Sequence, residues 1–124
     1  MSQHLHQTIA AFNSRNFKQA ARHAGEGLAM ARGRDEAFWM GLLDACEGYG
    51  LLAAKDFNNA EPKLIDSMHK LRNFGFRYNE FEITVALAGI RLALEEIRNV
   101  RGTTGRVFDV SLLPQLRLAE KAMV

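Results

Sequence analysis

The chain has few of the features that mark secreted, membrane-spanning or nucleic-acid-binding proteins. Its single cysteine, Cys46, excludes an internal disulfide framework and suits a reducing cytoplasm. No stretch approaches the roughly 20 apolar residues that span a bilayer, and residues 1–6 lack the basic start and apolar run of a signal peptide. The net charge of +2 provides no strong attraction to nucleic acid or an anionic membrane. We therefore expect a cytoplasmic protein that does not enter a membrane, and the charge balance disfavours nucleic-acid binding.

Prolines and strand-forming residues are also scarce. Two prolines interrupt 124 residues, and alanine and leucine dominate over valine, isoleucine and threonine, so helix is favoured over sheet. A chain of this length with 48% apolar residues forms one domain around one core. We predict an all-α, compact bundle of about five helices over residues 1–124. Its predicted parts are a helical body at about 3–100, a flexible loop at 101–107 and a C-terminal packing segment at 108–124.

A six-residue phrase occurs twice in the chain. Residues 15–20 read Arg-Asn-Phe-Lys-Gln-Ala, and residues 55–60 read Lys-Asp-Phe-Asn-Asn-Ala. Each copy contains a base, a helix-capping residue, a phenylalanine, two polar residues and an alanine, with an apolar helical pattern on both sides. The 40-residue offset (57 − 17) is a period at which helical arrays recur, so it predicts a repeated helix-turn-helix.

Apolar residues at helical spacing place the five helices. The expected ranges of the first, second, third and fifth helices are about 3–14, 17–32, 35–55 and 80–100. The fourth helix follows the second copy of the phrase. The helix at 35–55 is apolar nearly all round, which is typical of a central, buried helix. Gly25 and Gly27 each weaken the second helix by up to about 1 kcal/mol. Glycines at such positions often let a neighbouring helix approach closely.

Capping and proline signals predict three helix ends. Pro62 is tolerated in a first turn, so we place the start of the fourth helix near Asn58 or Asn59, slightly later than the repeat alone predicts. Asn79 and Glu82 have the spacing of a capping box, which predicts that the fifth helix begins at residue 80. Pro114 fits the first turn of a short final helix over about residues 113–122.

The repeated phrase resembles a tetratricopeptide repeat, which has an aromatic residue before its second helix and an alanine three positions later. The matching residues are Phe17 and Ala20 in the first copy and Phe57 and Ala60 in the second. The small residues that such repeats carry in their first helix are matched by Thr8 and Gly48. The period here is six residues longer than the usual 34 (40 − 34). The resemblance implies tetratricopeptide-like antiparallel hairpins without a regular array.

A second resemblance extends over residues 12–118. Its matching positions are Phe12-Asn13, Phe17, Phe38 to Leu43, Asn59-Ala60 and Leu64. They are similar to the pattern of the domain of unknown function 309 family, small all-helical prokaryotic proteins. The resemblance implies a bacterial helical bundle without an established biochemical role. Ala21-Arg22 replace the family's common His-Glu, and Met40, Asp44 and Gly50 replace its polar central positions, so chemistry of that polar cluster is not implied here.

Two carboxylates interrupt the most apolar helix. Asp44 and Glu47 are three residues apart, which places both on one face. One interpretation is a ligand pocket in which this pair acts as a general base or cation site. The candidate pocket residues are Asp44, Glu47, Trp39, Tyr49, His23 and Arg22. The alternative is a solvent-facing stripe, or ion pairs with Arg22, His23 or Arg91, because buried charges are costly unless paired.

Four aromatic residues gather around the linker before the fifth helix. They are Phe74, Phe76, Tyr78 and Phe81. They either plug the end of the bundle or form an exposed patch for a protein partner or a second copy.

Basic residues provide two weaker candidates for anion binding. Arg15, Lys18 and Arg22 form a stripe that could contact phosphate groups, although the near balance of charge favours a solvated face. Residues 101–106 read Arg-Gly-Thr-Thr-Gly-Arg and could form an anion-binding nest, but they lack the phosphate-loop pattern, which favours a plain loop.

No motif indicates catalysis. Metal-ligand spacings of histidine and cysteine are missing, as is a serine nucleophile elbow, and Cys46 lies in an apolar helix as a core residue would. We therefore predict no catalytic residue, metal or cofactor. The first hypothesis is a non-enzymatic interaction or scaffold module that self-associates or binds a protein partner through a helical groove or the aromatic group. The alternatives are a small-molecule-binding protein or enzyme using Asp44 and Glu47, and weak nucleic-acid association.

Overall fold

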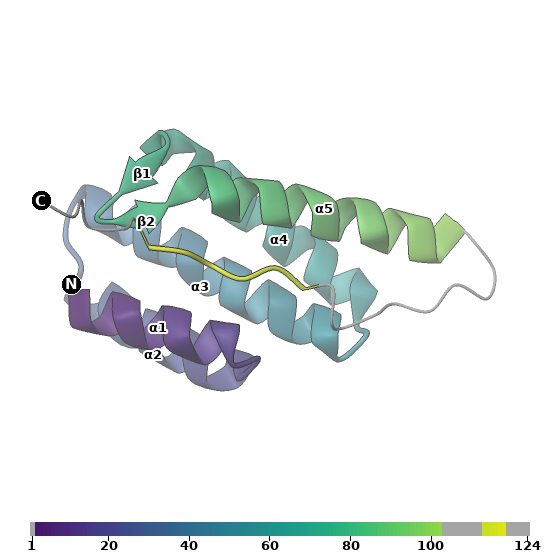
Figure 1. Cartoon of the computed structure of the whole chain (residues 1–124), viewed down its shortest axis with the longest axis horizontal. Helices are drawn as coiled ribbons and strands as arrows, with labels where there is room; N and C mark the ends of the chain where they lie inside the picture. The colour runs from purple at the N-terminus through teal and green to yellow at the C-terminus, as the bar shows by residue number, and fades with distance from the viewer. Residues whose placement is uncertain (1, 103–112, 119–124) are drawn as a thin grey trace, which may run out of the picture.

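The computed structural model describes residues 2–102 and 113–118. The helices are α1 (Ser2–Asn13), α2 (Phe17–Met30), α3 (Arg34–Ala53), α4 (Phe57–Leu71) and α5 (Ile83–Gly102). Between α4 and α5 lie a 3₁₀ turn, η1 (Arg72–Phe74), and two short antiparallel strands, β1 (Arg77–Tyr78) and β2 (Phe81–Glu82). The described chain is an all-α bundle, as predicted (Figure 1). Among these residues, no helix has the length and apolar character needed to cross a membrane.

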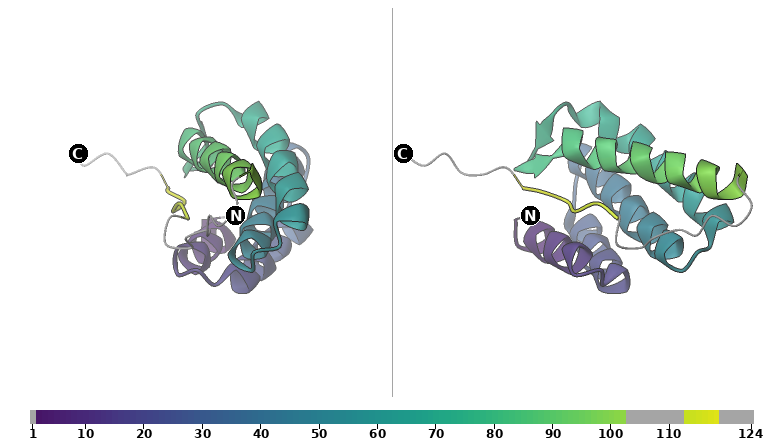
Figure 2. Two further views of the ribbon diagram at one scale, coloured as in Figure 1. Left: turned by 90° about the vertical axis from the view of Figure 1, so that its right-hand side faces the viewer. Right: turned by 45° about the vertical axis from the view of Figure 1, so that its right-hand side comes forward.

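The helices form an arc in which each packs against the next along the chain. Helix α3 packs against both α2 and α4, and α5 packs against α4. The view along the bundle in Figure 2 shows the arc, with residues 113–118 on its open side between α1 and α5. Figure 1 shows the same residues as an extended stretch of chain, coloured yellow, in front of α3. A part of the chain far from α1 in sequence therefore lies beside it in space.

Helix α3 is central, as its apolar character predicted. It packs between α2 and α4 and buries one broad face, whose large and small side chains are Phe38, Trp39, Leu42, Ala45, Cys46, Tyr49 and Leu52. Close approach to its neighbours depends on small residues. Ser67 of α4 is completely buried and donates a hydrogen bond of 2.7 Å to the carbonyl oxygen of Gly41 in α3. This contact fixes the register of α4 along α3, because sliding either helix would move the serine hydroxyl out of reach of that oxygen.

The two copies of the phrase form the same turn, so the repeated helix-turn-helix is confirmed. Arg15 and Lys55, the first residue of each copy, have positive φ angles of 65° and 63°. The N–H of Arg15 donates to the Phe12 carbonyl, and that of Lys55 to the equivalent Leu52 carbonyl, both at 2.9 Å. Asn16 caps α2 as expected, accepting a 3.2 Å hydrogen bond from a backbone N–H. The following phenylalanine begins the second helix of each pair.

Lys55→Gly is expected to raise the free energy of unfolding by about 0.5–1 kcal/mol, because glycine adopts a positive φ without the clash that a Cβ creates. Urea denaturation measures the change. Arg15→Gly is the matched control: it relieves the same strain but loses hydrogen bonds to residues 113 and 114, so we expect no gain from it. A Lys55→Gly variant that is less stable than the unaltered chain contradicts the prediction.

Helix α4 begins at Phe57, so the predicted start at Asn58 or Asn59 is wrong. Pro62 lies inside the helix. The turn sets the start, since Asn59 Nδ2 donates a 2.8 Å hydrogen bond to Asp56 Oδ2 at the N-cap. Asn58 and Pro62 are both exposed, so water can satisfy the carbonyl that the proline leaves without an N–H partner.

The predicted start of α5 is also wrong, because residues 77–82 form a small hairpin and the helix begins at Ile83. Asn79 and Glu80 have φ angles of 49° and 70°, the two consecutive positive values that a type I′ hairpin turn requires. The expected capping box therefore does not form. Helix α5 continues to Gly102, and the rest of the loop expected at 101–107 lies outside the described residues, as does 108–112.

The prediction of a short final helix is wrong for the residues that the structure describes. Residues 113–117 are not helical, and Leu118 forms an antiparallel bridge with Phe81. The prediction that this end of the chain packs on the body is confirmed for Leu113, which is buried. Residues 119–122 lie outside the described residues.

Candidate functional site

Residues 113–118, called here the C-terminal segment, are held mainly through their backbone. Asn13 at the end of α1 makes two hydrogen bonds with Leu116: its Nδ2 donates to the leucine carbonyl at 3.1 Å, and its Oδ1 accepts from the leucine N–H at 2.9 Å. The Arg15 guanidinium donates to the Pro114 carbonyl at 2.8 Å and to the Leu113 carbonyl. These bonds would form with almost any side chains on the segment, because they use main-chain atoms.

The other end of the segment extends the small sheet. The backbone N–H of Glu82 in β2 donates a 3.0 Å hydrogen bond to the carbonyl of Arg117. Phe81 and Leu118 form the antiparallel bridge beside it. The surface that receives the segment, called here the docking face, consists of Asn13, Arg15, Phe81, Glu82 and Gly89. It joins α1, the first turn, β2 and α5.

Side chains of the C-terminal segment add apolar anchors. Leu113 and Leu116 are 5% and 4% exposed, and Leu118 is partly buried against the core. Gln115 and Arg117 are exposed. An extended chain presents its side chains to opposite sides, so it can insert some of them and leave the others in solvent. The segment thus combines backbone recognition with leucine positions that can select a sequence.

Aromatic rings of the first turn and α3 pack together near the docking face. The ring of Phe12 lies edge-on to Phe17 and Tyr49, with both centroids 5.1 Å away. Tyr49 is 1% exposed, and burial raises the pKa of its hydroxyl, partly offset by the positive charge of Arg15. Among the described residues, its hydroxyl has no hydrogen-bond partner. The sequence hypothesis included Tyr49 in an acidic pocket, whereas its ring packs toward α1.

A cavity of about 360 Å³ adjoins the beginning of the C-terminal segment. Its lining residues are Gly89, Leu92, Ala93, Glu95, Glu96 and Asn99 of α5, with Leu113 and Pro114 of the segment. Leu92 is 66% exposed and adds apolar surface to the lining. The docking face therefore continues into a partly apolar cavity along α5.

The acidic pair of α3 faces lysines of α4. Lys70 Nζ lies 2.5 Å from Asp44 Oδ2, while Lys63 Nζ lies 3.3 Å from Glu47 Oε1 and 3.9 Å from Asp44 Oδ1. The Asp44 side chain is 14% exposed and that of Glu47 42%. The pair thus forms ion pairs, as one interpretation held, but with lysines that the sequence reasoning did not name. This arrangement supports the packing of α3 on α4.

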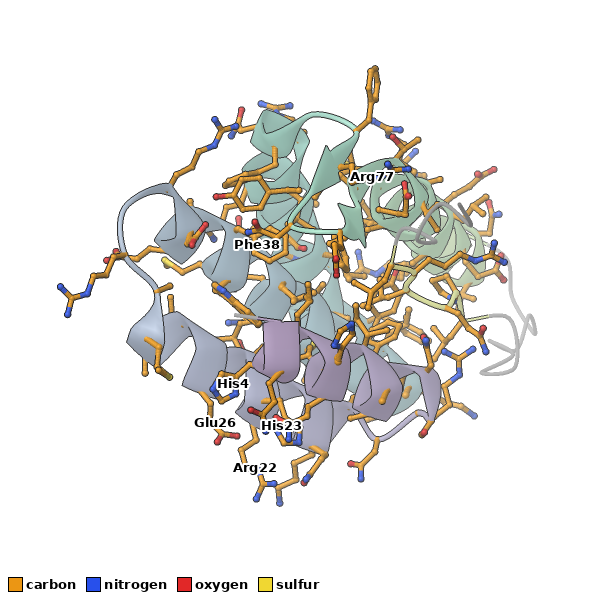
Figure 3. All side chains as sticks on the ribbon, turned by 60° about the vertical axis from the view of Figure 1, so that its left-hand side comes forward. His4, Arg22, His23, Glu26, Phe38 and Arg77 are labelled. Atoms are coloured by element: carbon orange, nitrogen blue, oxygen red, sulfur yellow. The ribbon has the colours of Figure 1, made fainter. Side chains whose placement is uncertain are left out.

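The other candidate pocket residues lie elsewhere. Trp39 is buried against α2, where it contacts Gly27. His23 lies in α2 with its Nδ1 3.2 Å from Glu26 Oε1, and Arg22 is exposed. Figure 3 shows Arg22, His23 and Glu26 together on the outer side of α2. The structure therefore does not gather the six candidates into one pocket.

Three of the four aromatic candidates pack onto the end of the bundle. Phe74 and Phe81 lie edge-on to Phe38 of α3, with centroids 5.8 Å and 5.6 Å away. The Tyr78 hydroxyl donates a hydrogen bond to Asp35, which raises the pKa of the tyrosine. Phe76 is 84% exposed. Phe74, Tyr78 and Phe81 therefore plug the end of the bundle, as the first interpretation held, and only Phe76 of the four is exposed.

Of the basic and nucleophilic candidates, Arg15 and Arg101 make structural contacts and Cys46 is buried in the core. Arg15 holds the C-terminal segment, whereas Lys18 and Arg22 are exposed, so the stripe is interrupted. Arg101 pairs with Glu61 of α4 at 2.8 Å, and residues 103–106 of the predicted nest lie outside the described residues. Burial raises the pKa of the Cys46 thiol to about 12. Over residues 2–102 and 113–118, no group of three or more histidine, cysteine or acidic residues is placed to hold a metal ion.

Sequence reasoning did not identify the docking face: it assigned other roles to Asn13, Arg15, Phe81 and Glu82 and did not consider Gly89. The signal in the sequence is weak: three leucines at spacings of three and two, and a proline in residues 113–118. Comparisons with protein-family models, curated proteins and solved structures found no match. A function for the docking face must therefore be argued from its geometry.

Proposed function

We propose that this chain is a non-enzymatic, cytoplasmic interaction module whose docking face binds an extended segment of a partner protein. The observation that carries the proposal is the backbone recognition of residues 113–118 by Asn13, Arg15 and β2. Proteins that bind extended peptides use main-chain hydrogen bonds for affinity and side-chain pockets for specificity. The chain's own C-terminal segment occupies the place of the partner.

The arrangement of the helices supports this proposal. Stacked helical hairpins of the tetratricopeptide-like kind leave concave surfaces that suit peptides. Here α1, α3 and α5 line the side of the arc on which the C-terminal segment lies (Figures 1 and 2). The side-chain amide of Asn13 pairs with both the N–H and the carbonyl of one residue, Leu116, as a donor and an acceptor. Such a pairing fixes the register of a bound chain without depending on its side chains.

The test is binding of a labelled peptide with the sequence of residues 111–120 to the full-length chain. Leu116→Asp in the full-length chain places a charge at a 4% exposed position and should loosen the C-terminal segment. We expect this variant to bind the peptide at least about tenfold more tightly than the unaltered chain, whose own segment competes at high effective concentration. Fluorescence anisotropy measures the affinity, and circular dichroism confirms that the variant is folded.

Two matched controls separate the docking face from general effects. Gln115→Asp adds the same charge at the exposed neighbouring position, so peptide binding should stay as weak as in the unaltered chain. Adding Asn13→Ala to Leu116→Asp should weaken binding, whereas adding Gln7→Ala, an exposed position of α1, should not. A folded Leu116→Asp chain that fails to bind the peptide contradicts the proposal. Sedimentation that shows concentration-dependent association, abolished by Leu116→Asp, would identify the partner as a second copy.

A further inference from the structure

The C-terminal segment leaves one buried polar group of the site unpaired. The hydroxyl of Tyr49 is shielded from solvent and has no hydrogen-bond partner among the described residues. A buried hydroxyl without a partner loses its hydrogen bonds to water and gains nothing in return. The nearby Arg15 guanidinium donates to two carbonyls of the segment. The unpaired hydroxyl is therefore a feature that the present occupant does not use.

Pro114 and the Tyr49 hydroxyl meet at Gly89 of α5. A Cβ built on Gly89 would lie 2.9 Å from Pro114 Cγ and 3.4 Å from the tyrosine oxygen. Pro114 has neither an N–H nor a polar side chain, and its carbonyl accepts from Arg15, so no group of this residue pairs with the hydroxyl. The cavity of about 360 Å³ lies on the same part of α5, beside Gly89 and Pro114. There is thus room beside the proline for a different small side chain.

We infer that the preferred partner of the docking face carries a small hydroxyl residue, serine or threonine, where the chain's own segment has Pro114. The inference rests on the proposed function and specifies its partner: an extended segment with leucines at the positions of Leu113, Leu116 and Leu118. A serine hydroxyl can both donate to and accept from Tyr49. It also lies one bond beyond Cβ, as Pro114 Cγ does, and so enters the space beside Gly89. The chain's own segment is then a weaker occupant that a partner can displace.

Three labelled peptides test the inference on the full-length Leu116→Asp chain. They have the sequence of residues 111–120 with proline, alanine or serine at position 114. We expect the serine peptide to bind about three- to tenfold more tightly than the alanine peptide, the effect of one net hydrogen bond. Tyr49→Phe, added to Leu116→Asp, removes the hydroxyl and keeps the ring. In that variant the serine and alanine peptides should bind equally.

The outcomes distinguish the two proposals. Equal binding of the serine and alanine peptides to the Leu116→Asp chain, or a preference that persists with Tyr49→Phe, overturns the inference and leaves the proposed function intact. Failure of every peptide to bind overturns both. A second measurement uses the chain without Leu116→Asp: Pro114→Ser should raise the urea midpoint, relative to Pro114→Ala, in the presence of Tyr49 but not with Tyr49→Phe. An equal difference in urea midpoint between Pro114→Ser and Pro114→Ala with Tyr49 and with Tyr49→Phe overturns the inference. This measurement does not require the Leu116→Asp/Tyr49→Phe chain to fold.

Discussion

Trp39→Ala is expected to lower the free energy of unfolding by about 3–5 kcal/mol, the largest effect of any single truncation proposed here. Trp39 is the largest of the fully buried side chains, with 1% of its surface exposed. Its ring lies edge-on to Phe38, with centroids 5.7 Å apart, and packs against Gly27 of α2. Removing it leaves a cavity between α2 and α3 that neither helix can fill by a small shift. Urea denaturation followed by circular dichroism measures the loss.

Met40→Ala is the matched control for this prediction. Met40 follows Trp39 in α3 and is 44% exposed, so its truncation should change the free energy of unfolding by no more than about 0.5 kcal/mol. A loss below about 1 kcal/mol for Trp39→Ala would show that the contact between α2 and α3 contributes little to stability. It would also contradict the central place assigned to α3.

The parts of the fold that the sequence predicted are those that local patterns determine. The apolar character of residues 35–55 identified the central helix because α3 packs against both α2 and α4. The repeated phrase identified two equivalent turns, since the same short sequence adopts the same backbone conformation at Arg15 and Lys55. Neither inference needed knowledge of distant contacts.

The extended C-terminal segment could not be predicted in the same way. Leu113 and Leu116 are three residues apart and Pro114 suits a first turn, so the local pattern is compatible with a helix. The observed conformation depends on Asn13 and Arg15, which lie about 100 residues earlier in the chain. Hydrogen bonds from those side chains replace the ones that a helix would have formed within the segment. A local pattern carries no information about such distant partners.

The partners of the acidic pair show the same limit. The cost of burying charge predicted that Asp44 and Glu47 need basic neighbours. Which bases these are depends on how α4 lies on α3, and that register follows from packing contacts such as Ser67 on Gly41. Lys63 and Lys70 lie seven residues apart, two turns along one face of α4, and so both reach the acidic pair.

Gly27→Ala is expected to lower the free energy of unfolding by about 1–3 kcal/mol, even though alanine favours a helix more than glycine does. A Cβ at Gly27 would lie 2.6–2.7 Å from three carbon atoms of the Trp39 ring, closer than carbon atoms can approach. The ring is enclosed by the core and can move only by disturbing other side chains. The strain should therefore exceed the gain in helix propensity. Urea denaturation under the conditions used for Trp39→Ala measures the balance.

Gly25→Ala provides a control of opposite sign in the same helix. No atom beyond the local helix backbone lies within 4 Å of a Cβ at this position, so the helix propensity of alanine should act alone and raise the free energy of unfolding by about 0.5–1 kcal/mol. In a chain that already carries Trp39→Ala, the cost of Gly27→Ala should disappear, because the missing ring leaves space for the methyl group. Equal gains in stability from Gly25→Ala and Gly27→Ala would show that α2 and α3 are not in close contact at Trp39. Close helix packing would then not explain the glycine at position 27.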